Sequence, residues 1–309
     1  EDYKQWKESI TNCSSYKIKY YKGLGSSTSD EAKKIFKTYS DSFIHYTCKN
    51  DNDIDCIDLA FSKGRINDRK SWIQKNTGKE LVLPKHKKVL LHDFFNTEFV
   101  QFSIADCVRS IPNLMDGLKP SQRKILFGFF KKNTPAELKV DQIRGYIAEH
   151  TLYAHGDLSL SETIISMNHD FVGSNNINLF IPCGFFGSRL HGGKDSASPR
   201  YISTKLNPLT RMIFNQHDDG LLNYNNEAGI SIEPEYYYPI IPMILINGSS
   251  GIGTGYSTDI PCFNPVDIIE CLRGMLSDDK YRIPELIPGY RGFKGSIYKK
   301  DNSYIVKGC

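Results

Sequence analysis

The stretch RSIPNLMDGLKPSQRKILFGFFKKN, from Arg109 to Asn133, indicates how the middle of the chain folds. Asp116-Gly117 predicts a turn, and Pro120 stands where a first helical residue is favoured. Apolar residues then recur at helical spacing, at Ile125, Leu126, Phe129 and Phe130. Short helices joined by tight turns, with basic residues near their starts, are typical of a helix-turn-helix unit. An ordinary helical core with solvated lysines has the same pattern, so periodicity alone leaves both interpretations open.

Helices are also expected on both sides of this stretch. Residues 104–111 predict a helix that Pro112 ends, and residues 135–150 predict another. Ser159 and Glu162 have the spacing of a capping box. A helix is predicted with them because apolar residues recur at helical spacing, at Leu160, Ile164, Met167 and Phe171.

From residue 175 onward the pattern changes to strands and turns. The sequences INLFIP (177–182) and YISTKL (201–206) flank a glycine-rich loop, and residues 239–247 predict another strand. A glycine-rich turn and a helix over 266–276 follow, and the chain ends in strand-like SYIVKG. Strands and helices combined in this way indicate a mixed α/β (α+β) fold.

The first 80 residues are rich in Lys, Asp and Ser. They predict a strand at 17–22 and a helix near Ala32, capped by Ser29 or Asp30. The sequence DNDID (51–55) lacks the glycine and the distant glutamate of a calcium-binding loop, so we interpret it as a solvated turn. Residues 81–100 are expected to connect this part to the helical unit.

The composition is that of a globular protein. Of 309 residues, 39% are hydrophobic and 24% charged, and the net charge of +4 is compatible with a nucleic-acid partner without demanding one. The longest apolar stretch, 240–246, is too short to span a bilayer, and no signal peptide opens the chain. Eight scattered cysteines without a C-x-x-C pair favour reduced thiols and an intracellular location. Because the first residue is not Met, we expect a segment of a larger protein.

The sequence GGKDSASPRYISTK, from Gly192 to Lys205, carries the clearest chemical signal. Its glycines let the backbone approach phosphates, and Arg200 can neutralise the charge on a phosphate that Tyr201 attacks. A phenol, with an ordinary pKa of about 10, needs such help at neutral pH. The alternative is a packing or surface role for Tyr201, because the chain contains 18 tyrosines.

Three further residues have both a functional and a structural interpretation. His155 precedes a predicted helix whose free N–H groups can bind phosphate, and Arg123 lies on the helix opened by Pro120. A structural histidine and a solvated surface arginine are each more common. Ile252, flanked by glycines in NGSSGIGTGYS (247–257), is either a wedge between base pairs or a core contact.

These blocks resemble, in order, the breakage-reunion region of eukaryotic-type topoisomerase II, a type IIA DNA topoisomerase. YKGLGSST (21–28) resembles the end of the family's Toprim domain, and the stretch from Arg109 resembles the start of its winged-helix domain. FVGSNNINL, GGKDSASPRYI and PEYYYPIIPMILINGSSGIGTGYSTDIP match further blocks. The resemblance implies three parts: residues 1–82 as the C-terminal part of Toprim with a linker, 83–235 as a winged-helix (CAP-like) cleavage domain, and 236–309 as the start of a tower domain.

The resemblance also implies a reaction, the transient cleavage and religation of both strands of a duplex by an ATP-hydrolysing isomerase. Tyr201 is then the nucleophile that forms a 5′-phosphotyrosyl bond, with Arg200, His155 and Arg123 around the scissile phosphate. Ile252 is the residue that intercalates to bend the DNA. The remaining expected DNA-binding residues are Lys22, Lys119, Lys124, Lys131, Lys132 and Lys194.

Cofactors and partners follow from the same resemblance. Mg²⁺ and ATP are expected, both bound outside this segment, so no residue here is assigned to a metal. The expected partners are double-stranded DNA and a second copy of the protein, with no membrane. Ala154 and Ser203 depart from the family pattern, and with the Asn- and Lys-rich composition they suggest an enzyme of a large DNA virus. The expected location is the nucleus, or cytoplasmic factories for a viral protein.

Two other functions remain open from the sequence. A winged helix with the same basic residues can bind DNA without cleaving it, and replacing Tyr201 separates the two because phosphate contacts do not need its hydroxyl. The glycines at 251–255 can also be interpreted as the turn of a nucleotide-binding oxidoreductase. That turn requires a helix directly after the glycines, whereas the next helix is expected only near Val266.

Overall fold

The computed structural model describes residues 2–12, 15–16, 27–79, 87–227, 229–301 and 303–308. Lys22 and the strand expected at 17–22 lie outside these residues. Helices and short strands alternate along the described chain, so the expected mixed α/β fold is confirmed. None of the described helices is long and apolar enough to cross a membrane.

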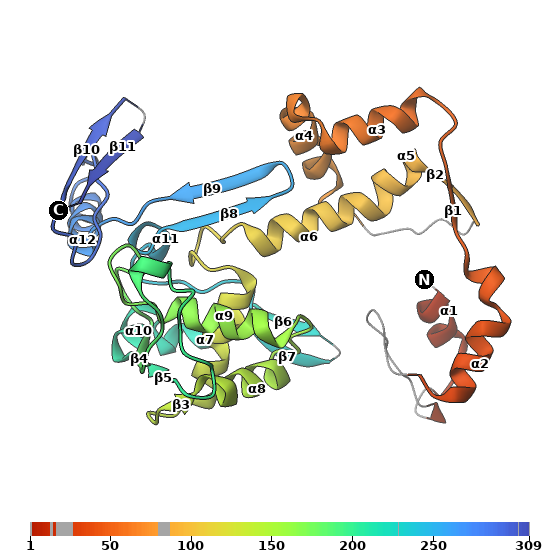
Figure 1. Ribbon diagram of the computed structural model, residues 1–309, viewed down its shortest axis with the longest axis horizontal. Helices are drawn as coiled ribbons and strands as arrows, with labels where there is room; N and C mark the ends of the chain where they lie inside the picture. The colour runs from red at the N-terminus through yellow and green to blue at the C-terminus, as the bar shows by residue number, and fades with distance from the viewer. Residues whose placement is uncertain are drawn as a thin grey trace.

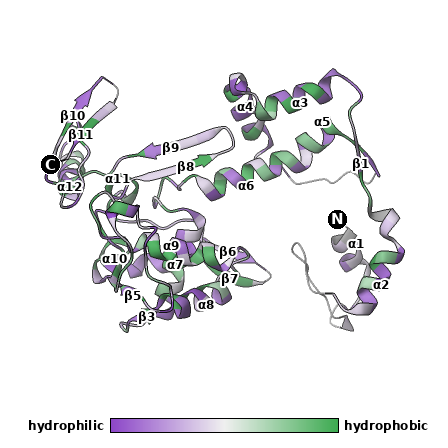
Figure 2. Cartoon of the chain, in the orientation of Figure 1, coloured by the Kyte–Doolittle hydropathy of each residue, from purple (hydrophilic) through white to green (hydrophobic). Residues whose placement is uncertain are grey.

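The central body consists of three helices and three strands that share one hydrophobic core. They are α7 (Pro120–Lys132), β3 (Leu138–Lys139), α8 (Val140–His150), α9 (Asp157–Met167), β4 (Phe180–Cys183) and β5 (Ser203–Leu206). The strands form an antiparallel sheet in the order β3-β5-β4. Figure 2 shows hydrophobic residues concentrated on α7 and α9 in the middle of this body. The core therefore fixes β5, the strand that begins directly after residues 201–202.

The chain then adds further helices and hairpins around this body. They are α10 (Pro208–Ile213), β6 (Tyr224–Glu227), β7 (Ile230–Pro234), α11 (Met243–Ile246), β8 (Ser249–Gly253), β9 (Tyr256–Ile260), α12 (Pro265–Ser277), β10 (Ser296–Lys300) and β11 (Ser303–Lys307). Each of the pairs β6–β7, β8–β9 and β10–β11 is an antiparallel hairpin.

The N-terminal part is mostly helical. Its elements are α1 (Asp2–Ser9), α2 (Ser29–Lys37), β1 (His45–Thr47), α3 (Asp51–Phe61), α4 (Ile66–Asn76), β2 (Lys88–Leu90), α5 (Leu91–Phe94) and α6 (Val100–Ser110). A π-helical segment, Phe95–Phe99, joins α5 to α6. Figure 1 shows α6 and the β8–β9 hairpin extending together from the body toward α3 and α4.

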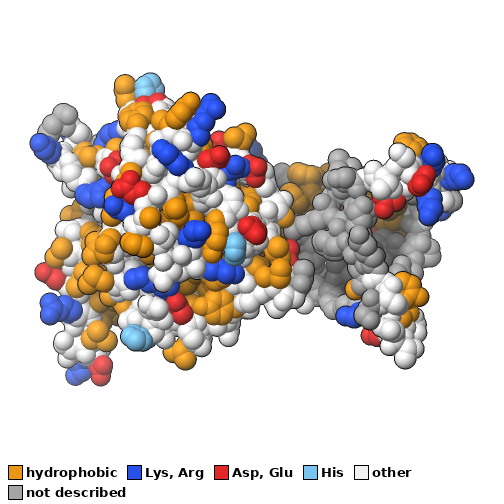
Figure 3. All heavy atoms as spheres, turned by 90° about the horizontal axis from the view of Figure 1, so that it is seen from below, with side chains coloured by type: hydrophobic (Ala, Val, Ile, Leu, Met, Phe, Trp, Pro, Cys, Tyr) orange, Lys and Arg blue, Asp and Glu red, His pale blue; other side chains and the backbone are white. Residues whose placement is uncertain are grey.

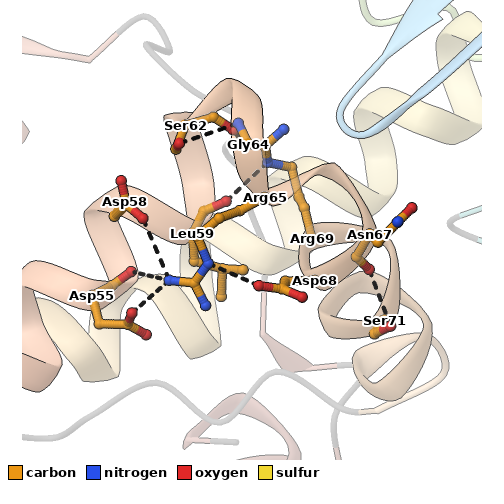
Figure 4. Close-up of polar contacts among 10 residues, drawn as sticks. All are labelled: Asp55, Asp58, Leu59, Ser62, Gly64, Arg65, Asn67, Asp68, Arg69 and Ser71. Atoms are coloured by element: carbon orange, nitrogen blue, oxygen red, sulfur yellow. Dashed lines mark hydrogen bonds and ion pairs between the residues drawn. The ribbon is translucent and has the colours of Figure 1, made fainter.

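Two arginines fix the corner between α3 and α4 (Figure 4). Arg69 donates from Nε to the Leu59 carbonyl at 3.0 Å and from Nη2 to the Ser62 carbonyl at 2.7 Å. Arg65 forms ion pairs with three aspartates, Asp55, Asp58 and Asp68. The backbone of the corner is therefore held from both sides, and α4 has a defined position beside the hairpin.

Several predicted elements are confirmed. Pro120 is the first residue of α7, Gly117 takes a positive φ of 71° in the expected turn, and α12 covers the helix predicted at 266–276. The helix expected at 104–111 is present as α6 but begins at Val100. Most of the connector expected at 81–100 is therefore helical where it is described, since α5 and the π-helical segment precede α6.

Two helix starts differ from the prediction because other residues cap them. Thr28, rather than Ser29 or Asp30, caps α2 and forms a capping box with Glu31. Helix α9 begins at Asp157, two residues before Ser159, and the capping box expected there is therefore wrong.

Three other local predictions are wrong. The helix expected from residue 135 begins only at Val140, because β3 comes first and pairs with β5. The strand expected at 239–247 contains the short helix α11 after Pro242. The solvated turn expected at 51–55 is the first turn of α3, where the fully buried Asp53 accepts hydrogen bonds from the backbone of Lys49, Asn50 and His92.

Candidate active site

Tyr201 lies at the end of a long loop, directly before the central strand β5. Its backbone N–H donates to the Ser198 carbonyl at 2.8 Å, which closes a turn. Its side chain is 67% exposed, whereas the next residue, Ile202, is buried in the core. The carbonyl of Tyr201 accepts a hydrogen bond from Lys139 Nζ at 3.1 Å. The phenol is thus presented to solvent from a backbone that is fixed on both sides.

Arg200 and Tyr201, predicted to act together, are brought together. The Arg200 guanidinium carbon lies 5.1 Å from the centroid of the Tyr201 ring. Arg200 is exposed, so its donors remain available to an anion beside the phenol. A nucleophile and a permanent positive charge therefore share one accessible surface.

The loop before Tyr201 is held by a carboxylate and a histidine that were not anticipated from the sequence. Asp195 accepts hydrogen bonds from Ser188, at 2.8 Å from the backbone N–H and 2.6 Å from the hydroxyl. These bonds from Ser188 lower the pKa of Asp195. Gly193 takes a φ of 82° and packs on the ring of His169, where an added Cβ would lie 2.2 Å from Cε1.

His169 is a half-buried support beneath this loop. Burial lowers its pKa, with a smaller opposing effect from Asp170 and Asp195. Its ring lies 4.9 Å from that of Phe171, and its Nε2 is buried without a hydrogen-bond partner. The ring therefore packs beneath the glycines of the loop. Asp195 could have been recognised from the sequence, because it lies in the same loop as Tyr201. His169 could not, because it is 32 residues away from Tyr201.

Arg123 and Lys124 have internal partners. Arg123 is buried, and it donates from Nε and Nη2 to Asp116 at 2.7 and 3.0 Å and from Nη2 to the Leu118 carbonyl at 2.9 Å. Lys124 Nζ contacts the Thr151 carbonyl at 2.7 Å and Glu233 at 2.8 Å. Their positive charges fix the turn before α7 and the contact of α7 with its neighbours. A direct phosphate contact by either residue stays a prediction.

His155 is exposed in the turn before α9, with its ring 5.5 Å from that of Tyr153. In the described part of the chain no hydrogen bond or ring contact joins it to Tyr201. Lys194 is exposed in the Tyr201 loop, and Lys131 and Lys132 lie at the end of α7 over the rings of Phe127 and Tyr146.

Figure 3 shows basic and acidic side chains interspersed on one face of the body, so that face is not uniformly basic.

Ile252 projects from the β8–β9 hairpin and is 82% exposed. Lys119 reaches the same hairpin, with its Nζ 2.8 Å from the Ser250 carbonyl, and burial lowers its pKa. The glycines around Ile252 form this hairpin, and the next helix begins only at Pro265. The turn required for a dinucleotide-binding oxidoreductase is therefore not formed here.

No cluster of three or more metal-ligating side chains occurs among the residues that the structure describes.

Comparison with known proteins gives matches along the whole chain. Residues 109–309 match the DNA gyrase/topoisomerase IV family, and residues 1–107 match the C-terminal associated domain of TOPRIM. The crystal structure titled Plasmodium falciparum topoisomerase II DNA-binding, cleavage and re-ligation domain is similar, with a TM-score of 0.81, 50% identity, and coverage of 99% of this chain and 42% of that one.

Curated relatives point the same way. The chain is 49% identical to the mitochondrial DNA topoisomerase 2 of Dictyostelium discoideum, over 100% of this chain and 24% of that protein. It is 47% identical to the DNA topoisomerase 2 of Saccharomyces cerevisiae, over 96% of this chain and 21% of that protein. The chain thus spans between a fifth and a quarter of the length of these relatives. The resemblance seen in the sequence is confirmed: the chain belongs to the type IIA DNA topoisomerases, with a region of the DNA gyrase/topoisomerase IV family preceded by a TOPRIM-associated domain.

Proposed function

We propose that this chain is the DNA-cleaving core of an ATP-dependent type II DNA topoisomerase. The observation that carries the proposal is the exposed phenol of Tyr201 beside the exposed guanidinium of Arg200, on a loop held by Asp195 and His169. Tyr201 Oη loses its proton and forms a bond to the scissile phosphorus, the bond from phosphorus to the 3′ oxygen breaks, and that oxygen takes up a proton and leaves as a hydroxyl. Religation reverses the step, so no phosphodiester bond is lost.

The residues around Tyr201 have distinct proposed roles. Arg200 stabilises the added charge on the phosphate, and exposed His155 donates or accepts a hydrogen bond there. Arg123 fixes the turn before α7 with Asp116, and a direct phosphate contact by Arg123 or Lys124 stays a prediction. Lys119, Lys131, Lys132 and Lys194 contribute phosphate contacts along the bound duplex, whereas the role of Lys22 is carried by the sequence alone.

Mg²⁺ and ATP belong to the proposed enzyme but would be bound outside the described residues. Mg²⁺ would stabilise charge at the scissile phosphate, and ATP hydrolysis would drive passage of a second duplex. The proposed partners are double-stranded DNA and a second copy of the protein. For such an enzyme a nuclear location is proposed. A viral origin stays a prediction that rests on the sequence departures at Ala154 and Ser203.

The test of this proposal compares the full-length protein with its Tyr201→Phe variant. Each is mixed with supercoiled plasmid and Mg²⁺, quenched with detergent, and assayed for protein bound to DNA 5′ ends. The wild type is expected to give linear, protein-linked DNA, and Tyr201→Phe none, while both bind DNA with an affinity that falls steeply with salt. Tyr298→Phe is the matched control, because this exposed tyrosine lies on β10 and should leave the adduct unchanged.

The other outcomes have definite meanings. An equal adduct from Tyr201→Phe would place the nucleophile elsewhere. DNA binding without any adduct from the wild type would favour a non-catalytic winged-helix module.

A further inference from the structure

The β8–β9 hairpin leaves Ile252 free while its backbone is closely held. On one side it packs against α6: an added Cβ at Gly251 would lie 2.1 Å from the Ser110 carbonyl oxygen, and one at Gly253 would lie 3.1 Å from Cys107 Cα. The two glycines that flank Ile252 therefore let the strand lie directly on the helix backbone. The side chain between them projects to the opposite, solvent-exposed side.

The tip of the hairpin has polar contacts with the same helix. Thr254 Oγ1 donates to Asp106 Oδ2 at 3.0 Å, and the Thr254 carbonyl accepts from Cys107 Sγ at 3.1 Å. The other oxygen of Asp106 accepts from Arg109 at 3.1 Å, which orients the carboxylate. Thr254 is only two residues from Ile252, so these bonds fix the position of the exposed side chain.

Helix α4 supports the hairpin from a second side. The ring of Tyr256 packs on the cluster formed by Trp72, Ile73 and Val100, and Lys70 Nζ lies 5.3 Å from its centroid. An added Cβ at Gly255 would lie 3.5 Å from the side chain of Arg69, whose guanidinium is held by two backbone carbonyls. The body supplies a third contact through Lys119 and Ser250.

We propose that Asp106 and Thr254 are positioning residues for DNA bending, which clamp the β8–β9 hairpin to α6 so that Ile252 can act as a rigid wedge. This inference rests on the proposed function, in which Ile252 inserts between base pairs. Separating two stacked bases costs a few kcal/mol, so a loosely held hairpin would deflect before the DNA bends. A hairpin that is already fixed loses no conformational freedom when it binds DNA. More of the free energy of the protein–DNA contacts is then available to bend the duplex.

The experiment measures bending separately from affinity in the full-length protein. A short duplex with a donor and an acceptor dye at its ends reports the bent population by energy transfer, and fluorescence anisotropy of the same duplex gives affinity. In Thr254→Val the ratio of bent to straight DNA should fall about fivefold, as expected for one lost hydrogen bond, and affinity should fall by no more than this factor, because bending is coupled to binding. Thr254→Ser keeps the hydroxyl and should bend DNA like the wild type.

Thr258 provides a matched control on the same hairpin. Its Oγ1 is buried without a hydrogen-bond partner, so Thr258→Val makes the same chemical change without breaking a bond and should bend DNA normally. Ile252→Ala tests the wedge itself and should bend least.

Each result decides a different point. Normal bending by Thr254→Val, with bending lost in Ile252→Ala, would overturn the clamp and leave the wedge standing. Normal bending by Ile252→Ala would overturn the wedge and the clamp with it. Loss of bending in Thr254→Val that Thr254→Ser does not restore would show a merely structural residue and also overturn the clamp.

Discussion

The Tyr201 loop and the β8–β9 hairpin each present one exposed side chain from a fixed backbone, but they are fixed in different ways. The loop is held chiefly by polar groups, with Asp195 bonded to Ser188 and a neutral His169 beneath Gly193. The hairpin is held mainly by close approach of its glycines to α6, with one hydroxyl–carboxylate bond at its tip. Changes of charge and pH should therefore disturb the loop. Added side-chain volume, or loss of the hydroxyl–carboxylate bond, should disturb the hairpin.

The largest expected effect in this comparison comes from Gly193→Ala. Alanine at a positive φ costs about 1–2 kcal/mol, and overlap with the His169 ring adds about 1–3 kcal/mol. DNA cleavage should fall by about tenfold or more beyond the loss in Gly192→Ala, which has a φ of 60° but open space for a Cβ. Plasmid cleavage under single-turnover conditions measures this. Bending should be unchanged, and equal losses in the two variants would show that strain alone matters.

A smaller effect is expected from Asp195→Asn. It removes the charge on the carboxylate that accepts two hydrogen bonds from Ser188, so cleavage should fall about fivefold, less than in Gly193→Ala, while DNA bending stays normal. Ser188→Ala removes only the hydroxyl and should lose less. Asp279→Asn, at an exposed site, controls for the change in net charge and should cleave like the wild type. Reduced bending in Asp195→Asn would contradict the separation of the two regions.

The smallest effect concerns pH. Burial lowers the pKa of His169 in the folded state, so well above pH 6.5 the ring is neutral in both states and its packing is fully present. As pH falls from 6.5 through the lowered folded-state pKa, the unfolded chain gains a proton more readily, and the free energy of unfolding decreases. Urea unfolding at pH 7.5 and 5.5 should show this decrease, reduced in His169→Gln. The exposed His217→Gln is the control, and an unchanged pH dependence in His169→Gln would refute the assignment.

The parts of the fold visible in the sequence were those with local signals. Pro120 and the apolar spacing after it predicted α7, because the first turn of a helix tolerates proline and one face must be buried. Four apolar residues at 243–246 carry no such information, since a buried strand and a short helix look alike, and the strand prediction was wrong. Asp53 was also misjudged, because one of its donors, the backbone of His92, lies 39 residues away.

In the candidate site, too, local features could be predicted from the sequence and contacts between distant segments could not. Tyr201 and Arg200 are adjacent, so their pairing followed from the sequence motif and is present in the structure. The support from His169 depends on a contact between distant segments. For Arg123 the sequence predicted the element but not the environment. Its place at the start of α7 was clear, but its burial against Asp116 depends on tertiary packing.

Helix α6 has a consequence for how this protein can be divided. The two family matches meet at residue 108, inside the last turn of α6, between Cys107 and Ser110 that support the hairpin. A polypeptide starting at Arg109 would keep the hairpin but lose Asp106, Cys107 and the cluster around Trp72 that packs on Tyr256. The boundary between the two families therefore lies inside a unit that is packed as one. A chimera joining the helices of one relative to the body of another would receive a hairpin shaped for a different helix.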